Sequence, residues 1–178
     1  MAHPVTATTE NRYEVVMSRH LDAAPALVWR AFTEPQHMAA WWGPSTFTAR
    51  AEMDLRPGGA YLIDMIDPDG NVSPMRGKYI EVLPPHRLVF DFDISEHGPE
   101  FNRMLRESYM AAGGGADDAL GTSNIIVVTF EAEDGGTRLT FRQSLASAAE
   151  RDAYVKMGTV EGFTESLIKL DRLLTELA

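Results

Sequence analysis

The chain has 178 residues, 44% of them hydrophobic and 24% charged, a composition typical of one globular domain that can bury a sizeable core. The formal net charge of -10 argues against the basic surface that nucleic-acid-binding proteins need, and it opposes docking on anionic membranes. The lack of cysteine excludes disulfides, thiolate metal sites and a cysteine nucleophile, and it fits a reducing compartment.

The first twelve residues are polar and contain no apolar core of a signal peptide. We therefore expect a flexible tail over residues 1–12, a single domain over residues 13–178, and a cytoplasmic protein. No apolar run approaches the roughly 20 residues that a transmembrane helix needs, so we expect no membrane insertion.

Apolar and polar residues alternate over residues 13–21, which predicts a strand with one buried face. Pro25 and Pro35 each precede a short apolar stripe. Proline suits the first turn of a helix, where its missing N–H costs nothing, so two short helices are predicted. The second of them ends at Gly43-Pro44.

Six further segments combine apolar alternation with flanking turn sequences, and each predicts a strand. They cover residues 47–55, 60–66, 75–83, 88–94, 125–130 and 137–143. Short links between successive strands imply an antiparallel meander.

One link is long, and we treat residues 96–122 as an insertion that contains an amphipathic helix over 99–112. Loops of this length are often lids or binding loops, but they can also be mobile. We leave open whether the insertion is a functional lid, a partner contact or a dispensable segment.

The last helix gives the strongest periodic signal in the chain. Ser147 and Glu150 have the spacing of a capping box, and Gly158 is expected to break or bend the helix. Apolar residues then recur every three or four positions from Val160 to Leu177. A stripe of this size must cover a large apolar surface, and the sheet is the only candidate.

Five stretches of sequence together are typical of one family. In chain order they are DAAPALVWRAFTEPQHMAAWWGP, DLRPGGAYLIDM, GKYIEVLPPHRLVF, GGTRLTF and GTVEGFTESLIKLDRLL. The chain therefore resembles the bacterial proteins named after the activator of the heat-shock-protein-90 ATPase, within the START-like, or Bet v allergen-like, SRPBCC superfamily. The resemblance covers residues 13–178 apart from the insertion.

The resemblance implies an α+β helix-grip fold. A curved seven-stranded antiparallel sheet would wrap around the C-terminal helix, with two short helices between the first and second strands. A cavity between sheet and helix commonly holds lipids, polyketides or other apolar molecules in this superfamily.

Aromatic and methionine side chains are the candidates for lining such a cavity, although the same residues could simply fill a solid core. The candidates are Trp41, Trp42, Phe47, Tyr61, Met65, Met75, Tyr79, Phe90, Phe92, Phe141, Met157 and Phe163. Because two adjacent tryptophans on a helix point about 100° apart, one of Trp41 and Trp42 should anchor the helix while the other reaches the cavity.

Catalytic patterns are sparse. No phosphate-binding glycine loop, nucleophile elbow or His-Glu-x-x-His motif is present. The histidines, at positions 3, 20, 37, 86 and 97, have no metal-ligand spacing, so we expect no metal and no cofactor.

We therefore predict a protein that binds a hydrophobic small molecule, without enzymatic activity. A cyclase or dehydratase is the first alternative, and it would need Asp64, Glu81 or His37 to face the cavity. The second alternative, which the family name suggests, is a chaperone-regulating interaction module. A homodimer formed through the insertion helix is also plausible, whereas nucleic acid is not an expected partner.

Overall fold

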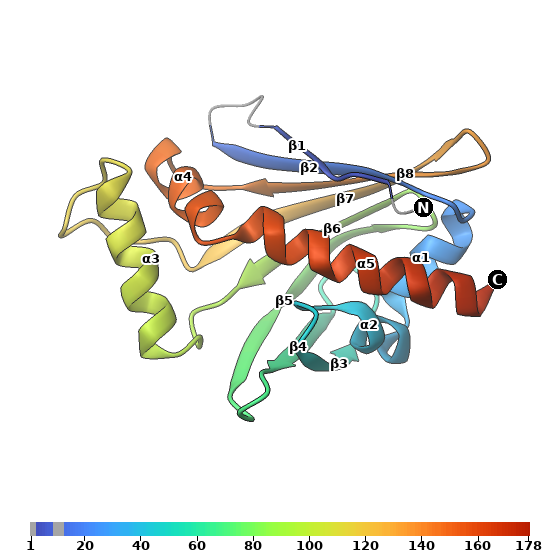
Figure 1. The fold of residues 1–178 in the computed structure, drawn as a ribbon, viewed down its shortest axis with the longest axis horizontal. Coiled ribbons are helices and arrows are strands. Elements are labelled where there is room, and N and C mark those ends of the chain that lie inside the picture. Colours follow the sequence, from blue (N-terminus) through green and yellow to red (C-terminus); the bar gives the residue numbers. More distant parts are fainter. Residues whose placement is uncertain (1–2, 9–12) are drawn as a thin grey trace.

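The computed structural model describes residues 3–8 and 13–178, in which an eight-stranded antiparallel sheet combines with five helices (Figure 1). This confirms the predicted α+β helix-grip class but corrects the number of strands, which we expected to be seven. The additional strand, β1 (Thr6–Thr8), lies in the segment predicted as a tail and pairs with β2 (Glu14–Leu21). The rest of that segment lies outside the described residues, apart from positions 3–5.

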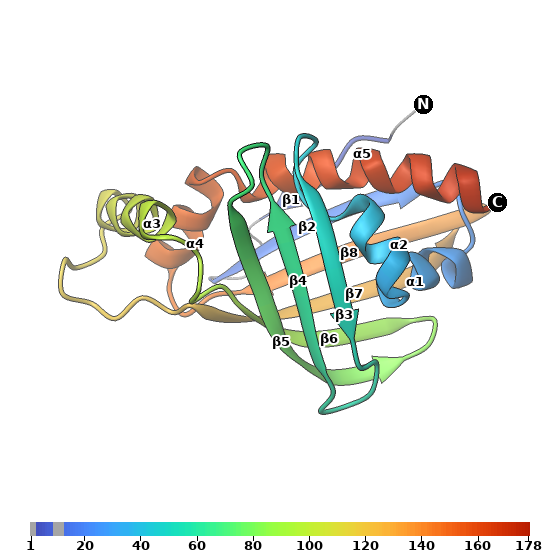
Figure 2. The ribbon, with the colours of Figure 1, turned by 90° about the horizontal axis from the view of Figure 1, so that it is seen from below.

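The other strands occupy the predicted segments, and neighbours in sequence pair antiparallel. They are β3 (Thr48–Met53), β4 (Ala60–Ile66), β5 (Val72–Leu83), β6 (Arg87–Asp93), β7 (Ser123–Glu133) and β8 (Gly136–Ser144). The order across the sheet is β1-β2-β8-β7-β6-β5-β4-β3, so β2 joins the far edge of the meander. Figure 2 shows that β3, β4 and β5 run steeply across the direction of β2, β8 and β7, which curves the sheet.

Helices α1 (Pro25–Thr33) and α2 (Pro35–Trp41) each begin at the predicted proline. Helix α4 (Ala148–Lys156) begins after Ser147, whose hydroxyl accepts the backbone N–H of Glu150 as the capping box predicts. Gly158, with a φ of 88°, then redirects the chain into α5 (Thr159–Leu177), because this left-handed conformation is open to glycine at little cost. None of the helices in the described ranges is long and apolar enough to cross a membrane.

Helix α5 runs across the sheet, with α1 and α2 beside its C-terminal half and α4 at its N-terminal end (Figures 1 and 2). Phe163 stacks against Phe141 of β8 with ring centroids 4.6 Å apart. Farther along, the buried Arg19 of β2 forms an ion pair with Asp171. Burial raises the pKa of Asp171, and the nearby Arg19 opposes that rise. An aromatic contact and an ion pair therefore hold α5 over the inner face of the sheet.

The insertion folds around α3 (Pro99–Ala111), close to the predicted helix, and packs on α4. Its return segment is held by hydrogen bonds: the Tyr109 hydroxyl and the Gly115 N–H both donate to Asp118, each at 2.8 Å. The buried carboxylate of Glu150 accepts the backbone N–H groups of Gly121 and Ala146 at 2.8 and 2.7 Å. The insertion is thus tied into the fold by buried contacts.

Candidate functional site

Two hollows lie between the sheet and the helices, and they share Trp42 and Met75. The first, which we call the closed hollow, lies beneath α1 and α2 and has a volume of about 10 Å³. The second, which we call the open cavity, lies beside the N-terminal half of α5 and has a volume of about 260 Å³. The closed hollow has room for about one water molecule.

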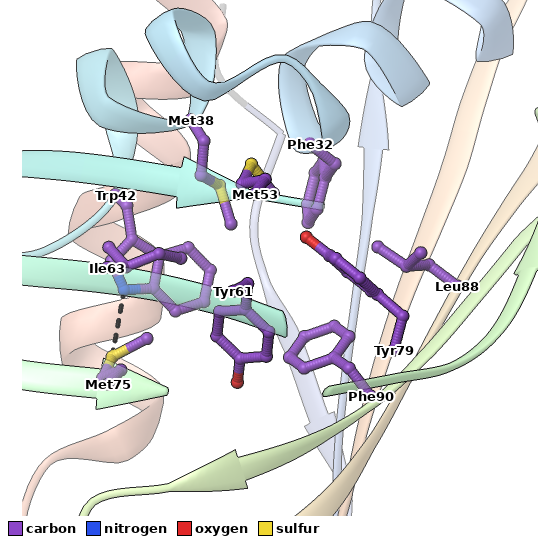
Figure 3. Close-up of a pocket in the computed structure, with 10 residues that line it drawn as sticks. All are labelled: Phe32, Met38, Trp42, Met53, Tyr61, Ile63, Met75, Tyr79, Leu88 and Phe90. Carbon is purple, nitrogen blue, oxygen red and sulfur yellow. Dashed lines mark hydrogen bonds between the residues drawn. The ribbon is translucent and has the colours of Figure 1, made fainter. Parts of the chain in front are cut away.

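Figure 3 shows the ten side chains of the closed hollow converging from α1, from α2 and the residue that follows it, and from strands β3–β6. They are Phe32, Met38, Trp42, Met53, Tyr61, Ile63, Met75, Tyr79, Leu88 and Phe90. The indole N–H of Trp42 points at the sulfur of Met75, 3.2 Å away, and the Tyr61 hydroxyl donates to the Asp91 backbone carbonyl at 2.7 Å. The Tyr79 hydroxyl is buried and has no hydrogen-bond partner in the described part of the chain. Burial raises the pKa of Tyr79.

The open cavity is lined almost entirely by apolar groups from β2, β4–β8, α3, α4, α5 and the loops after α2, β6 and α4. Its walls contain Met17, Trp42, Gly43, Pro44, Met65, Met75, Phe92, Ile94, His97, Phe101, Ile126, Phe141, Gln143, Tyr154, Met157, Gly158, Thr159, Gly162, Phe163 and Ser166. Three of the four residues that face it from the first half of α5, Thr159, Gly162 and Ser166, are small. Space therefore remains where larger side chains would have filled it.

The structure divides the twelve residues that we selected from the sequence. Seven of them border the open cavity: Trp42, Met65, Met75, Phe92, Phe141, Met157 and Phe163. Tyr61, Tyr79 and Phe90 border only the closed hollow.

Trp41 and Phe47 border neither hollow. Trp41 is the anchoring member of the tryptophan pair, because its ring packs 4.7 Å from that of Phe32 and its indole N–H donates to the Ala31 carbonyl at 2.9 Å. Phe47 is half-buried in the loop beside Gly43.

His97 also borders the open cavity, and sequence reasoning did not select it. It is only 8% exposed, and its Nε2 is buried without a hydrogen-bond partner among the described residues. Burial lowers the pKa of His97, while a hydrogen bond with the backbone carbonyl of Pro74 acts in the opposite direction. At neutral pH the ring is therefore uncharged.

Most other polar groups of the open cavity are engaged within the protein. The hydroxyls of Ser166 and Thr159 donate to the carbonyls of Gly162 and Tyr154 at 2.9 and 2.8 Å. The Tyr154 hydroxyl accepts the side-chain amide of Asn124 at 3.4 Å, and burial raises the pKa of this tyrosine to about 12. Neither this phenol nor the two hydroxyls can serve as a base near neutral pH.

Two charged residues of α5 hold the loop that forms one wall of the open cavity. The Lys169 ammonium donates to the backbone carbonyls of Trp42, Gly43 and Phe47 at 3.3, 3.3 and 3.2 Å. The Glu165 carboxylate accepts both the backbone N–H and the hydroxyl of Ser45, at 2.8 and 2.9 Å. These contacts fix residues 43–47 to the helix.

The three candidates for acid–base chemistry lie elsewhere. Asp64 forms an ion pair with Arg50 at 3.1 Å, and Glu81 forms one with Arg87 at 2.9 Å. His37 lies 2.9 Å from the carboxylate of Glu34. None of the three borders the open cavity.

One group of potential metal ligands occurs in residues 3–8 and 13–178. It consists of His3, His20 and Asp22, whose ligand atoms lie within 4.8 Å of one another. Asp22 is 3.2 Å from the His3 ring and 3.5 Å from the His20 ring, so contacts among the three side chains themselves account for the arrangement. The group lies at the surface near the end of α5, away from the open cavity.

The model of the family described as "Activator of Hsp90 ATPase homolog 1-like protein" matches residues 22–175. The chain belongs to this family. A search of the curated proteins finds no match for it.

Solved structures of similar proteins support the fold of this family member. A protein from Mycobacterium smegmatis is 26% identical, with a TM-score of 0.76 over 98% of this chain and 100% of its own. A protein from Arthrobacter aurescens is 24% identical, with a TM-score of 0.75 over 97% and 91% of the two chains. A protein from Nitrosomonas europaea is also 24% identical, with a TM-score of 0.73 over 93% and 96%.

The residues that sequence reasoning missed come mainly from two places. Ile94 ends the strand predicted over residues 88–94, and His97 and Phe101 belong to the start of the insertion, whose place relative to the core the sequence does not show. Met17 and Ile126 are buried strand residues. The alternation of apolar residues predicts that such residues face the interior, but it does not show which of them border a cavity. The apolar side predicted for α3 was the available signal for Phe101.

Proposed function

We propose that this member of the family binds a small hydrophobic molecule in the open cavity. The supporting observation is a volume of about 260 Å³ with mostly apolar walls, next to a closed hollow of about 10 Å³ built from the same kinds of side chain. The volume is slightly below the roughly 300–1,000 Å³ of typical ligand pockets, which favours a compact guest. The helix-grip fold commonly binds hydrophobic ligands.

Energetics favour a filled cavity. At about 24 cal/mol per Å³, an enclosed and empty space of 260 Å³ would cost on the order of 6 kcal/mol, which is an upper bound for the open cavity because it opens to solvent. This is comparable with the total stability of many domains, roughly 5–15 kcal/mol. Entry of water lowers the cost, but water gains few partners on apolar walls. An apolar guest recovers the contacts that the walls otherwise lack.

The position of the ionisable groups favours binding over a cyclase or dehydratase. That alternative required Asp64, Glu81 or His37 inside the cavity, and each of them has a partner elsewhere. A role as a chaperone regulator is supported by the family name alone. Self-association through α3 stays a prediction, although Met104 and Met110 leave that helix with exposed apolar surface.

Blocking the cavity tests the proposal directly. A Cβ atom placed on Gly162 meets nothing within 4 Å, so Gly162→Leu can extend into the open cavity from a helical position that favours leucine. We expect this variant to bind naphthalene at least about tenfold more weakly in a fluorescence titration. The leucine side chain would occupy space that naphthalene needs, and losing the apolar contacts of one ring costs more than about 1.4 kcal/mol.

Thr175→Leu is the matched control, because Thr175 is exposed on the same helix and does not border the open cavity. It should leave the affinity unchanged. Native mass spectrometry of freshly purified protein adds an independent readout of a copurified guest and of the subunit count. Absence of any guest, together with equal naphthalene binding by both variants, would rule out the proposed site.

A further inference from the structure

Gln143 is a polar residue on the apolar inner face of β8. It follows Phe141 by two positions, so the two side chains point to the same side of the sheet, and it pairs with Val15 of β2 and Ile126 of β7. The residue is only 3% exposed, and it borders the open cavity. Buried polar side chains are ordinarily hydrogen-bonded within the protein, so a glutamine at this position calls for a partner.

The side-chain amide of Gln143 has no partner in residues 3–8 and 13–178, because none of the hydrogen bonds in these ranges involves it. A polar side-chain atom without a partner is either enclosed by the protein or open to a cavity. The enclosed atoms of this kind in the same ranges are Nε of Arg19, the hydroxyl oxygen of Tyr79 and Nε2 of His97. Because neither amide atom of Gln143 is among them, both atoms keep accessible surface, and the open cavity is the space that the residue borders.

The hydroxyl groups in the wall of the open cavity are in a different situation. Those of Thr159 and Ser166 donate to backbone carbonyls at 2.8 and 2.9 Å, and that of Tyr154 accepts the side-chain amide of Asn124 at 3.4 Å. Gln143 differs from them because its oxygen and its nitrogen both remain open. Water or a bound molecule must therefore complete the hydrogen bonds of this amide.

The charge of the walls restricts the guest further. None of the residues that border the open cavity is Lys, Arg, Asp or Glu. A carboxylate or an ammonium group on the guest would lose hydration without gaining a counterion, which is unfavourable in apolar surroundings. A neutral molecule avoids that cost.

We infer that the guest is a neutral compact molecule with a carboxamide or lactam group that pairs with the side-chain amide of Gln143. This inference rests on the proposed function, since it assigns the chemistry of a molecule in the same cavity. A glutamine amide holds an acceptor oxygen and a donor NH2 group side by side. A guest that contacts one of them leaves the other unpaired, whereas the C=O and N–H of a carboxamide match both with two hydrogen bonds.

Three probes of nearly equal shape test this pairing. 2-Naphthamide, 2-acetonaphthone and 2-naphthoate share a naphthalene ring and a carbonyl carbon, which carries NH2, CH3 or O⁻ respectively. 2-Acetonaphthone can accept from Gln143 but cannot donate to it, and 2-naphthoate is charged at neutral pH. By isothermal titration calorimetry, we expect wild-type protein to bind 2-naphthoate at least about tenfold more weakly than 2-naphthamide, because the walls offer no counterion.

Gln143→Met removes the amide while keeping a side chain of similar length. It should lower the ratio of the affinities for 2-naphthamide and 2-acetonaphthone by about fivefold to tenfold, the usual effect of one hydrogen bond. Comparing this ratio between variants cancels the different hydration of the two probes. Thr140→Met is the matched control, because Thr140 lies on the outer face of the same strand and does not border the open cavity. It should leave the ratio unchanged.

A measurement on wild-type protein keeps the test decisive if circular dichroism shows that Gln143→Met does not fold. The side-chain amide resonances of Gln143, assigned by triple-resonance NMR, should shift more on addition of 2-naphthamide than on addition of naphthalene. Equal shifts, or an unchanged affinity ratio in folded Gln143→Met, overturn the pairing while the cavity proposal stands. Equal binding of 2-naphthoate and 2-naphthamide overturns the neutral guest. Failure of wild-type protein to bind naphthalene and all three derivatives overturns the proposed function itself.

Discussion

The closed hollow and the open cavity use the same kinds of side chain yet differ in volume by more than an order of magnitude. Large residues such as Phe32 and Met38 reach down from α1 and α2 and fill the closed end. At the open end, the covering positions of α5 include Gly162 and Ser166, which are small. Whether an apolar interior keeps space is therefore decided by the size of the side chains that cover the sheet, rather than by how aromatic the sheet is.

Truncating one methionine at each end should give the largest difference in stability. Met38→Ala in the closed hollow should lower the free energy of unfolding by about 2–5 kcal/mol, because the side chain is closely surrounded. Met157→Ala beside the open cavity should cost only about 1 kcal/mol, since that side chain is half-buried and faces space. Urea denaturation measures both values. Equal losses would mean that the two ends are packed alike.

Adding one methyl group at two glycines, one in β5 beside the neighbouring strand β6 and one in the wall of the open cavity, reverses the experiment. A Cβ atom on Gly77 would lie 2.2 Å from the backbone oxygen of Asp91, whereas one on Gly162 meets nothing within 4 Å. Gly77→Ala should therefore cost about 1–3 kcal/mol. Gly162→Ala should raise the free energy of unfolding by up to about 1 kcal/mol, because alanine favours the helix. Thermal unfolding distinguishes the two, and a destabilised Gly162→Ala variant would contradict the open space at that position.

Removing a hydroxyl at two positions of the closed hollow should give the smallest effects, with opposite signs. Tyr79→Phe removes a buried hydroxyl that has no partner in the described residues, so we expect a gain of about 1 kcal/mol. Tyr61→Phe removes the bond to the Asp91 carbonyl, so we expect a loss of about 1 kcal/mol. Chemical denaturation under identical conditions compares the pair. A loss in both variants would indicate that the Tyr79 hydroxyl is bonded in solution.

Much of the fold could be predicted because its signals are local. The prolines at 25 and 35, the alternation along the strands and the period of the last helix each depend on neighbouring residues. The strand β1 was missed because three residues, Thr6–Thr8, are too short to show a period. It forms only through its pairing with β2, a contact that the sequence does not encode locally.

The candidate site was harder to predict than the fold. Alternation shows which strand residues face the interior, but Tyr61 and Phe92 are equally inward by that criterion and lie at different ends. The difference depends on how α2 and α5 sit over the sheet, which is a tertiary property. His97 had no pattern to reveal it, because it lies at the start of a long insertion and reaches the cavity only once α3 packs on α4.

The contacts of Lys169 and Glu165 have a consequence for the size of molecule that can be accommodated. These side chains lie one helical turn apart, and together they hold the loop that carries Gly43 and Pro44 into the cavity wall. If the open cavity binds a molecule as we propose, a bulky one could displace the helix only by moving the loop with it or by breaking the hydrogen bonds between the Lys169 ammonium and three backbone carbonyls. Under that proposal, these contacts would favour compact molecules without touching them.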